Sequence, residues 1–181
     1  MTKNRKYNIL AISGSTRKSS VNLQILNAIA DLISGSLSIQ IYEGLDKLPH
    51  FNPDLDNDYA PELVQVFRTK IKEADGVLIC TPEYVFSLPG SLKNAIEWTV
   101  STTVFSQKPV AIITASALGE KTHEALQLIM KTIEAKVSEQ TQLLISGAKS
   151  KVNGRGEFVD EITLNKINAL MASFIKMLNK S

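Results

Sequence analysis

The stretch that decides the fold runs from Leu10 to Asn22 and reads LAISGSTRKSSVN. Its first residues continue an apolar run from Tyr7 that is typical of a buried strand, and apolar residues at helical spacing begin at Val21. A strand, a polar turn and a helix in this order direct backbone N–H groups toward an anion. The turn combines one glycine and one guanidinium with hydroxyl and amide side chains, namely Gly14, Ser15, Thr16, Arg17, Ser19, Ser20 and Asn22.

This turn predicts a binding site for a phosphate monoester, because an Arg guanidinium can bind two phosphate oxygens at once. A structural role stays open, since Ser and Asn before a helix are common N-caps and Gly is ordinary in turns. The turn lacks the G-x-x-x-x-G-K-[ST] motif of NTPases and the Cys nucleophile of a protein phosphatase. It is not G-x-G-x-x-G either, because Thr16 and Ser19 occupy the second and third glycine positions.

The composition is that of an ordinary globular protein. The chain has 181 residues, of which 44% are hydrophobic and 21% charged, and its formal net charge is +2. This charge implies no strong field for nucleic acid or a membrane surface, and no run approaches the roughly 18 apolar residues of a membrane helix. Cys80 is the single cysteine and cannot form an internal disulfide. We therefore expect one domain over residues 1–181, a cytoplasmic location, and neither nucleic acid nor membrane as a partner.

Strand-like and helix-like patterns alternate along the chain and predict an α/β fold, with a parallel sheet and helices on both faces. Continuous apolar runs such as residues 76–80 are typical of central parallel strands. A long loop is expected at residues 43–61. Strands are expected at residues 8–13, 38–42, 76–80, 109–115 and 140–145, and helices at residues 21–34, 61–74, 91–99, 120–135 and 162–178.

The loop at residues 81–90, TPEYVFSLPG, carries a second set of candidate binding groups. Tyr84 and Phe86 offer flat apolar faces, and Pro82 and Pro89 stiffen the backbone around them. In a doubly wound sheet of order 2-1-3-4-5, ligands bind beyond the carboxyl ends of the first and third strands. The phosphate turn, this loop and the turn at residues 116–119 then meet at one edge. Together they predict a site for a planar ring with a phosphorylated tail; a loop whose aromatic residues only pack is the alternative.

LAISGSTRKSSVN and TPEYVFSLPGSLKNAIEW together resemble the NAD(P)H-dependent FMN reductase family. The family pattern is approximately G-S-x-R-x-x-S-x-N after the first strand and T-P-E-Y-N-x-S-x-P-G-x-L-K-N-A-x-[DE]-W after the third. The resemblance implies a flavodoxin-like three-layer sandwich with a five-stranded parallel sheet of order 2-1-3-4-5. It also implies an enzyme that passes hydride from NADPH or NADH through bound FMN to a small acceptor: a quinone, flavin, azo compound or metal oxyanion.

Carried over position by position, the resemblance implies which residues bind FMN. Ser15, Arg17, Ser20 and Asn22 match the residues around its phosphate. Because the flavin carries the chemistry, no catalytic side chain is expected. Lys93, Asn94 and Trp98 match the helix that follows, where packing, a subunit contact and ligand binding are all compatible with the resemblance. The residues expected around the flavin ring are Pro82, Glu83, Tyr84, Val85, Phe86, Ser87 and Ser116.

The chain departs from the family pattern at two places. Val85 stands where the family usually has Asn, so only backbone groups could serve there. Residues 116–123 read SALGEKTH, where the family often has a glycine-rich turn followed by Arg, so the choice between NADH and NADPH is not fixed by the resemblance. Glu83 is expected to pair with Arg17 or to lie at a subunit contact.

The cysteine, the histidines and the net charge bear on metal binding and on alternative functions. Cys80 is expected in the core, and His50 and His123 lack the spacing of metal ligands, so no metal is expected. The resemblance implies a homodimer or homotetramer. One alternative is a flavodoxin-type electron carrier without NAD(P)H activity of its own, which the net charge disfavours because flavodoxins are usually acidic. Another is a flavin-free nucleotide enzyme of the same fold, which would need well-placed acidic groups.

Overall fold

The fold is described here from a computed structural model, which covers residues 6–57, 59–153 and 155–180; the ends of the expected domain, residues 1–5 and 181, lie outside the described residues. Five parallel strands form one sheet in the order β2-β1-β3-β4-β5, which confirms the expected topology. At the carboxyl ends, Ser13 of β1 pairs with Cys80 of β3, and Thr81 pairs with Thr114 of β4. The strands are β1 (Tyr7–Ser13), β2 (Leu37–Ile41), β3 (Gly76–Thr81), β4 (Val110–Ser116) and β5 (Gln142–Ser146).

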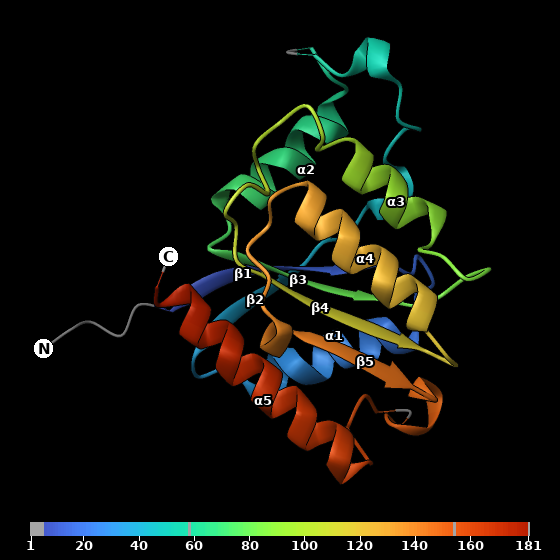
Figure 1. The fold of residues 1–181 in the computed structure, drawn as a ribbon, viewed down its shortest axis with the longest axis vertical. Coiled ribbons are helices and arrows are strands. Elements are labelled where there is room, and N and C mark those ends of the chain that lie inside the picture. The colour runs from blue at the N-terminus through green and yellow to red at the C-terminus, as the bar shows by residue number, and fades with distance from the viewer. Residues whose placement is uncertain (1–5, 58, 154, 181) are drawn as a thin grey trace, which may run out of the picture.

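Helices cover both faces of the sheet, as Figure 1 shows. On one face lie α1 (Val21–Leu32) and α5 (Glu161–Leu178), and on the other lie α2 (Glu62–Glu73), α3 (Gly90–Glu97) and α4 (Glu120–Thr132). Alternate residues of β3 supply the two cores, with Val77 and Ile79 facing α2, α3 and α4, and Leu78 and Cys80 facing α1 and α5. Both faces of the sheet are therefore buried under helices, which explains the continuous apolar runs in the sequences of the central strands.

The elements lie where the sequence placed them and differ at their ends. The helix expected at residues 120–135 ends at Thr132, because Glu134 takes a left-handed backbone conformation with φ of 58°. The last strand begins at Gln142, because residues 139–141 form a short 3-10 turn that Ser138 and Thr141 close with a reciprocal cap. The first helix ends at Leu32 rather than residue 34.

The long loop after β2 is fastened to α3. The carbonyl of Pro49 accepts hydrogen bonds from Nε1 of Trp98 at 2.8 Å and from Nδ2 of Asn94 at 3.0 Å. The amide of Phe51 donates to Oδ1 of Asn94 at 2.7 Å, and its ring meets Trp98 edge to face. In this structure, Asn94 and Trp98 therefore pack the loop against the helix. Within the described ranges, no helix combines the length and apolar character needed to cross a bilayer.

Candidate functional site

The turn between β1 and α1 is a compact loop built on its own hydroxyl groups. The hydroxyl of Ser13 donates to the carbonyl of Ser15 at 3.0 Å, and Oγ of Ser15 accepts from the amide of Arg17 at 3.4 Å. Ser20 is the N-cap of α1, because its Oγ accepts from the amide of Leu23 at 3.1 Å. The structural role weighed for these residues thus holds for Ser20, yet its hydroxyl hydrogen is still available to an oxyanion.

Gly14 is needed for close packing of the loop against β3. Its amide donates to the carbonyl of Cys80 at 2.8 Å. A Cβ built on Gly14 would lie 2.2 Å from Oγ1 and 2.6 Å from Cβ of Thr81. The absence of a side chain at Gly14 therefore lets the turn approach the neighbouring strand.

The side chain of Asn22 is fixed by a hydrogen bond from Cys80. Both side chains are buried, and the Cys80 thiol donates to Oδ1 of Asn22 at 3.3 Å. Burial raises the pKa of the Cys80 thiol well above its usual range, so this group is a neutral donor. With Oδ1 occupied by the thiol, the amide NH₂ of Asn22 is the part that can donate to a ligand.

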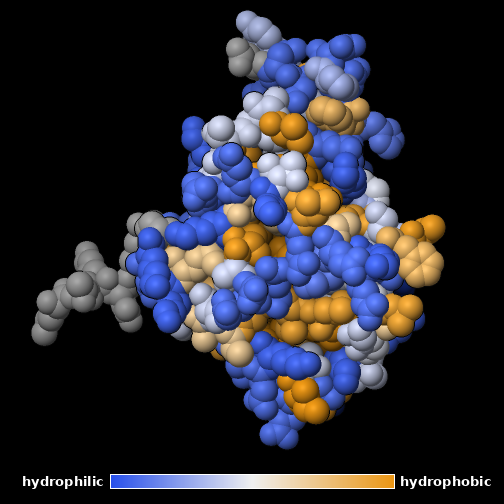
Figure 2. All heavy atoms as spheres, viewed as in Figure 1, coloured by the Kyte–Doolittle hydropathy of each residue, from blue (hydrophilic) through white to orange (hydrophobic). Residues whose placement is uncertain are grey.

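The loop after β3 forms a tight two-residue hairpin. The amide of Tyr84 donates to the carbonyl of Ser87 at 3.0 Å, and the amide of Ser87 returns a bond of 3.1 Å. The two central residues, Val85 and Phe86, have φ of 52° and 57°, the left-handed region that a type I′ turn requires. These two residues are 96% and 69% exposed, and the loop that carries them, between β3 and α3, projects at the right-hand edge of the molecule in Figure 1. Figure 2 shows hydrophobic atoms at this edge.

Tyr84 connects this hairpin to the turn between β1 and α1. Its hydroxyl lies 3.5 Å from Oγ of Ser15, so the loops after β1 and β3 meet over the carboxyl edge of the sheet. The side chain of Glu83 binds the start of α4 instead. Its two carboxylate oxygens accept from the amides of Gly119 at 3.3 Å and Thr122 at 3.0 Å, at the start of α4. The expected pairing of Glu83 with Arg17 is therefore replaced by a bond to the N-terminus of a helix.

These loops enclose a pocket of about 560 Å³ at the carboxyl edge of the sheet. This volume falls within the range of about 300–1,000 Å³ that is usual for small-molecule sites. Val85, Phe86, Ser87 and Glu83 do not line it. The expected residues that line the pocket are Ser15, Arg17, Ser20, Asn22, Pro82, Tyr84 and Ser116.

The loop after β5 also lines this pocket, and the sequence reasoning missed it. Gly147, Ala148, Lys149 and Ser150 contribute a second cation and another hydroxyl. The signal was present, because residues 147–160 read as a glycine- and charge-rich connection after the last strand. Since all parallel strands end at the same edge, this loop belonged with the others.

The histidines lie outside the pocket. His123 is half-buried on α4, and its Nδ1 lies 2.9 Å from Oγ1 of Thr114. Burial lowers the pKa of His123, which keeps the ring neutral near pH 7. In the part of the chain that the structure describes, no three His, Cys, Asp or Glu side chains come together as metal ligands would.

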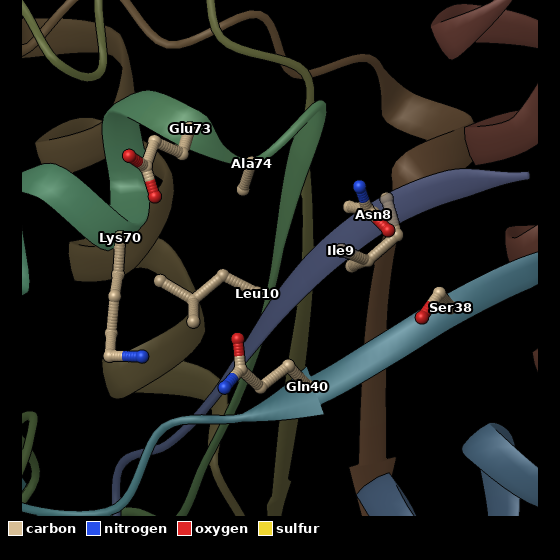
Figure 3. Close-up of a pocket in the computed structure, with 8 residues that line it drawn as sticks. All are labelled: Asn8, Ile9, Leu10, Ser38, Gln40, Lys70, Glu73 and Ala74. Carbon is tan, nitrogen blue, oxygen red and sulfur yellow. The ribbon is translucent and has the colours of Figure 1, made fainter.

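A second cavity of about 320 Å³ lies between α2 and the bodies of β1 and β2. Figure 3 shows Lys70 of α2 and Gln40 of β2 extending toward each other, with Leu10 between them. Its charged lining residues are one cation and one carboxylate on the same helix, Lys70 and Glu73. This cavity lies away from the carboxyl ends of the strands, where the polar loops converge.

The sequence profile of the NADPH-dependent FMN reductase family matches residues 7–150. The chain belongs to this family. A 2-hydroxy-1,4-benzoquinone reductase from a Burkholderia species is 32% identical over 92% of this chain and 93% of the relative. An NADPH:quinone oxidoreductase from Arabidopsis thaliana is 33% identical over 91% and 88%. The solved structure of FerB, a flavoenzyme NAD(P)H:(acceptor) oxidoreductase from Paracoccus denitrificans, is 26% identical, covers 96% of this chain and 98% of that chain, and superposes with a TM-score of 0.78.

Family membership makes this reductase an NAD(P)H-dependent oxidoreductase with FMN as cofactor, and the flavodoxin-like fold is confirmed. The pocket suits FMN. One end carries donors for a phosphate, from the Ser15 hydroxyl, the Arg17 guanidinium and the N-terminus of α1. Toward β4 the lining includes the apolar residues Ala115 and Ala117 together with Ser116, and Pro82 and Tyr84 add flat apolar surface that suits a planar ring.

Proposed function

We propose that the protein reduces quinones with electrons from NADPH or NADH, using FMN bound in the pocket at the carboxyl edge. The quinone as acceptor is supported by the names of the relatives from Burkholderia and Arabidopsis thaliana. When bound, FMN supplies the chemistry, which is to accept hydride from the nicotinamide and deliver two electrons to the acceptor. The chain supplies position and charge, and no side chain is proposed as a nucleophile or a base.

The phosphate of FMN is assigned to the turn between β1 and α1. The Arg17 guanidinium would neutralise its charge, and Ser15, Ser20 and the NH₂ of Asn22 would donate to its oxygens. This assignment is supported by the convergence of all four side chains on one pocket. Lys149 adds a second positive charge to the same lining.

The flavin ring is assigned to the space between the loops after β3 and β4. Pro82 and Tyr84 would form one wall and Ser116 another, since all three line the pocket. Val85, Phe86 and Ser87 would take part through their backbone only. The support is the hairpin, whose Val85 and Phe86 side chains are exposed and do not line the pocket, while Tyr84 at its base does.

The further proposals concern assembly and location. A homodimer or homotetramer is supported by the resemblance and by the exposed apolar tip at Val85 and Phe86. Static light scattering at micromolar concentration tests it, and a monomer would contradict it. We further propose that residues 1–181 act as one FMN-binding domain in the cytoplasm, where nicotinamide nucleotides are available.

The observation that carries the proposal is the pocket in which Arg17 meets the hydroxyls of the turn and the ring of Tyr84. Arg17→Ala should weaken FMN binding about tenfold or more, the scale of a lost charge-assisted hydrogen bond. Lys18→Ala is the matched control, because Lys18 carries the same charge on the next residue and does not line this pocket. Equal affinities of the two variants, measured by quenching of flavin fluorescence, would contradict the assignment.

Activity is tested on the FMN-loaded protein under anaerobic conditions. Addition of NADPH or NADH should bleach the flavin absorbance, and 1,4-benzoquinone should restore it. The faster donor identifies the preferred nucleotide. A flavin that resists both nucleotides would contradict the reductase and favour a one-electron carrier.

A further inference from the structure

Glu83 ties the loop after β3 to the helix after β4. It directly follows Pro82, which lines the pocket, and precedes Tyr84, which also lines it. Its carboxylate accepts from the amide of Gly119 at 3.3 Å and from that of Thr122 at 3.0 Å. These amides are the N-cap and third-residue positions of α4, so the carboxylate caps a helix from a loop that is 36 residues away along the chain.

The helix needs this cap because it has none of its own. Its N-cap is Gly119, which makes no side-chain hydrogen bond to the helix. The glycine is required there, since its φ is 99° and a Cβ would lie 2.9 Å from the Leu144 side chain. The first amides of a helix lack partners within the helix, and a carboxylate satisfies them and interacts favourably with the helix dipole.

The loop needs the attachment as well. Val85 and Phe86 both hold left-handed backbone conformations, which are unfavourable for a β-branched and an aromatic residue. Their side chains are mostly exposed, so little packing holds them in place. Such strain persists only where the surroundings fix the backbone on either side. The bonds from Glu83 to α4 fix the residues immediately before this turn.

We propose that Glu83 is a positioning residue that sets the Pro82–Tyr84 wall of the flavin pocket by binding the N-terminus of α4. It contacts the helix and not the pocket, so it does not bind FMN directly. The inference rests on the proposed assignment of the ring to this wall. Without the attachment the wall would spend part of its time away from the binding position, and the apparent affinity would fall by that fraction.

The test compares Glu83→Gln with Glu120→Gln in the full chain. Both variants remove one negative charge near the first turn of α4, but Glu120 lies on the helix itself and is exposed. Glu83→Gln should raise the dissociation constant for FMN about tenfold, whereas Glu120→Gln should change it less than about twofold. Hydrogen exchange, read without FMN, should show faster exchange of the Gly119 and Thr122 amides in Glu83→Gln alone.

A double-mutant cycle separates positioning from a general loss of stability. Phe86→Gly places the residue that a type I′ turn favours at its second central position. The gain in FMN affinity from Phe86→Gly should be about threefold larger in the Glu83→Gln background than in the wild-type background. A simple structural defect in α4 would not be rescued by a change in the hairpin.

The outcomes are distinct. Wild-type protein that binds no FMN would refute the proposed function and the inference that rests on it. Wild-type binding that Glu83→Gln leaves unchanged would refute the positioning role alone. An equal loss in Glu120→Gln, or the same effect of Phe86→Gly in both backgrounds, would also refute it. If Glu83→Gln fails to fold, unprotected Gly119 and Thr122 amides in the wild-type protein would overturn the inference, and protected ones would support it.

Discussion

Gly14→Ala should destabilise the protein strongly, although it adds only one methyl group. That methyl group would lie 2.2 Å from Oγ1 of Thr81, 2.6 Å from its Cβ and 3.1 Å from Cδ2 of Leu92. The threonine cannot move away easily, because it is fully buried at the end of β3. Gly14 cannot move away either, because its amide donates a hydrogen bond to the carbonyl of Cys80 at 2.8 Å. The clash must therefore separate β1 from β3 at the carboxyl edge.

The expected loss is at the upper end of the overpacking range, about 3 kcal/mol in the free energy of unfolding. For a chain of this length, about 2–4 °C of melting temperature is lost per kcal/mol, so the melting temperature should fall by about 6–12 °C. FMN affinity should fall as well, because the turn proposed to bind the phosphate begins at this residue. Thermal unfolding followed by circular dichroism measures the first effect, and quenching of flavin fluorescence measures the second.

Gly35→Ala is the matched control. It makes the same change at a glycine whose Cβ would meet nothing within 4 Å. Its free energy of unfolding should stay within about 1 kcal/mol of the wild type, with a small gain from the lower entropy of the unfolded chain. If the free energies of unfolding of Gly14→Ala and Gly35→Ala differ by less than about 0.5 kcal/mol, the close packing of β1 on β3 does not constrain the turn. That result would refute the prediction.

Two further predictions concern Asp160, which is the N-cap of α5, and the contact of Cys80 with Asn22, a residue that lines the pocket. Hydrogen bonds from Thr163 and then Lys151 lower the pKa of Asp160 to about 2, so this carboxylate stabilises the fold above its unfolded pKa of about 3.9 and loses that effect as pH falls toward 2. The difference in urea stability between wild type and Asp160→Asn should shrink over this range, and a constant difference would contradict the cap. Cys80→Ala should weaken FMN binding about two- to tenfold by freeing the Asn22 amide; Cys80→Ser, which keeps a donor, should bind more tightly than Cys80→Ala, and equal affinities would contradict this role.

The fold followed from local pattern. The alternation of apolar runs with helical periodicity required a parallel sheet, because each strand–helix–strand unit returns the chain to the same edge. The structure corrected only the ends of elements, where single residues decide. Glu134 ends α4 by its left-handed backbone, and Ser138 delays the start of β5 by its cap with Thr141. Hydrophobic periodicity encodes neither the backbone angle of Glu134 nor the cap at Ser138.

The site was predicted less completely than the fold. The hydroxyls and guanidinium of the first turn line one pocket with Pro82, Tyr84 and Ser116, as expected from their places at or just after the ends of strands; their contact with FMN stays a prediction. The loop after β5 was missed, because its glycine- and charge-rich composition was interpreted as a connection and was not combined with its place after a parallel strand. Glu83 was assigned to the flavin or to Arg17, because its actual partners are backbone amides, which have no signature in a sequence.

The sequence by itself determined the class of the fold, the polar turn after β1 that is proposed to bind the phosphate, and the aromatic loop beside it. These depend on contacts between near neighbours along the chain, which composition and spacing express directly. Only the tertiary structure decided that Cys80 orients Asn22, that Glu83 caps α4, and that Gly14 meets Thr81. Each of these pairs is joined across strands or layers, so its distance is set by packing and is absent from the order of the residues.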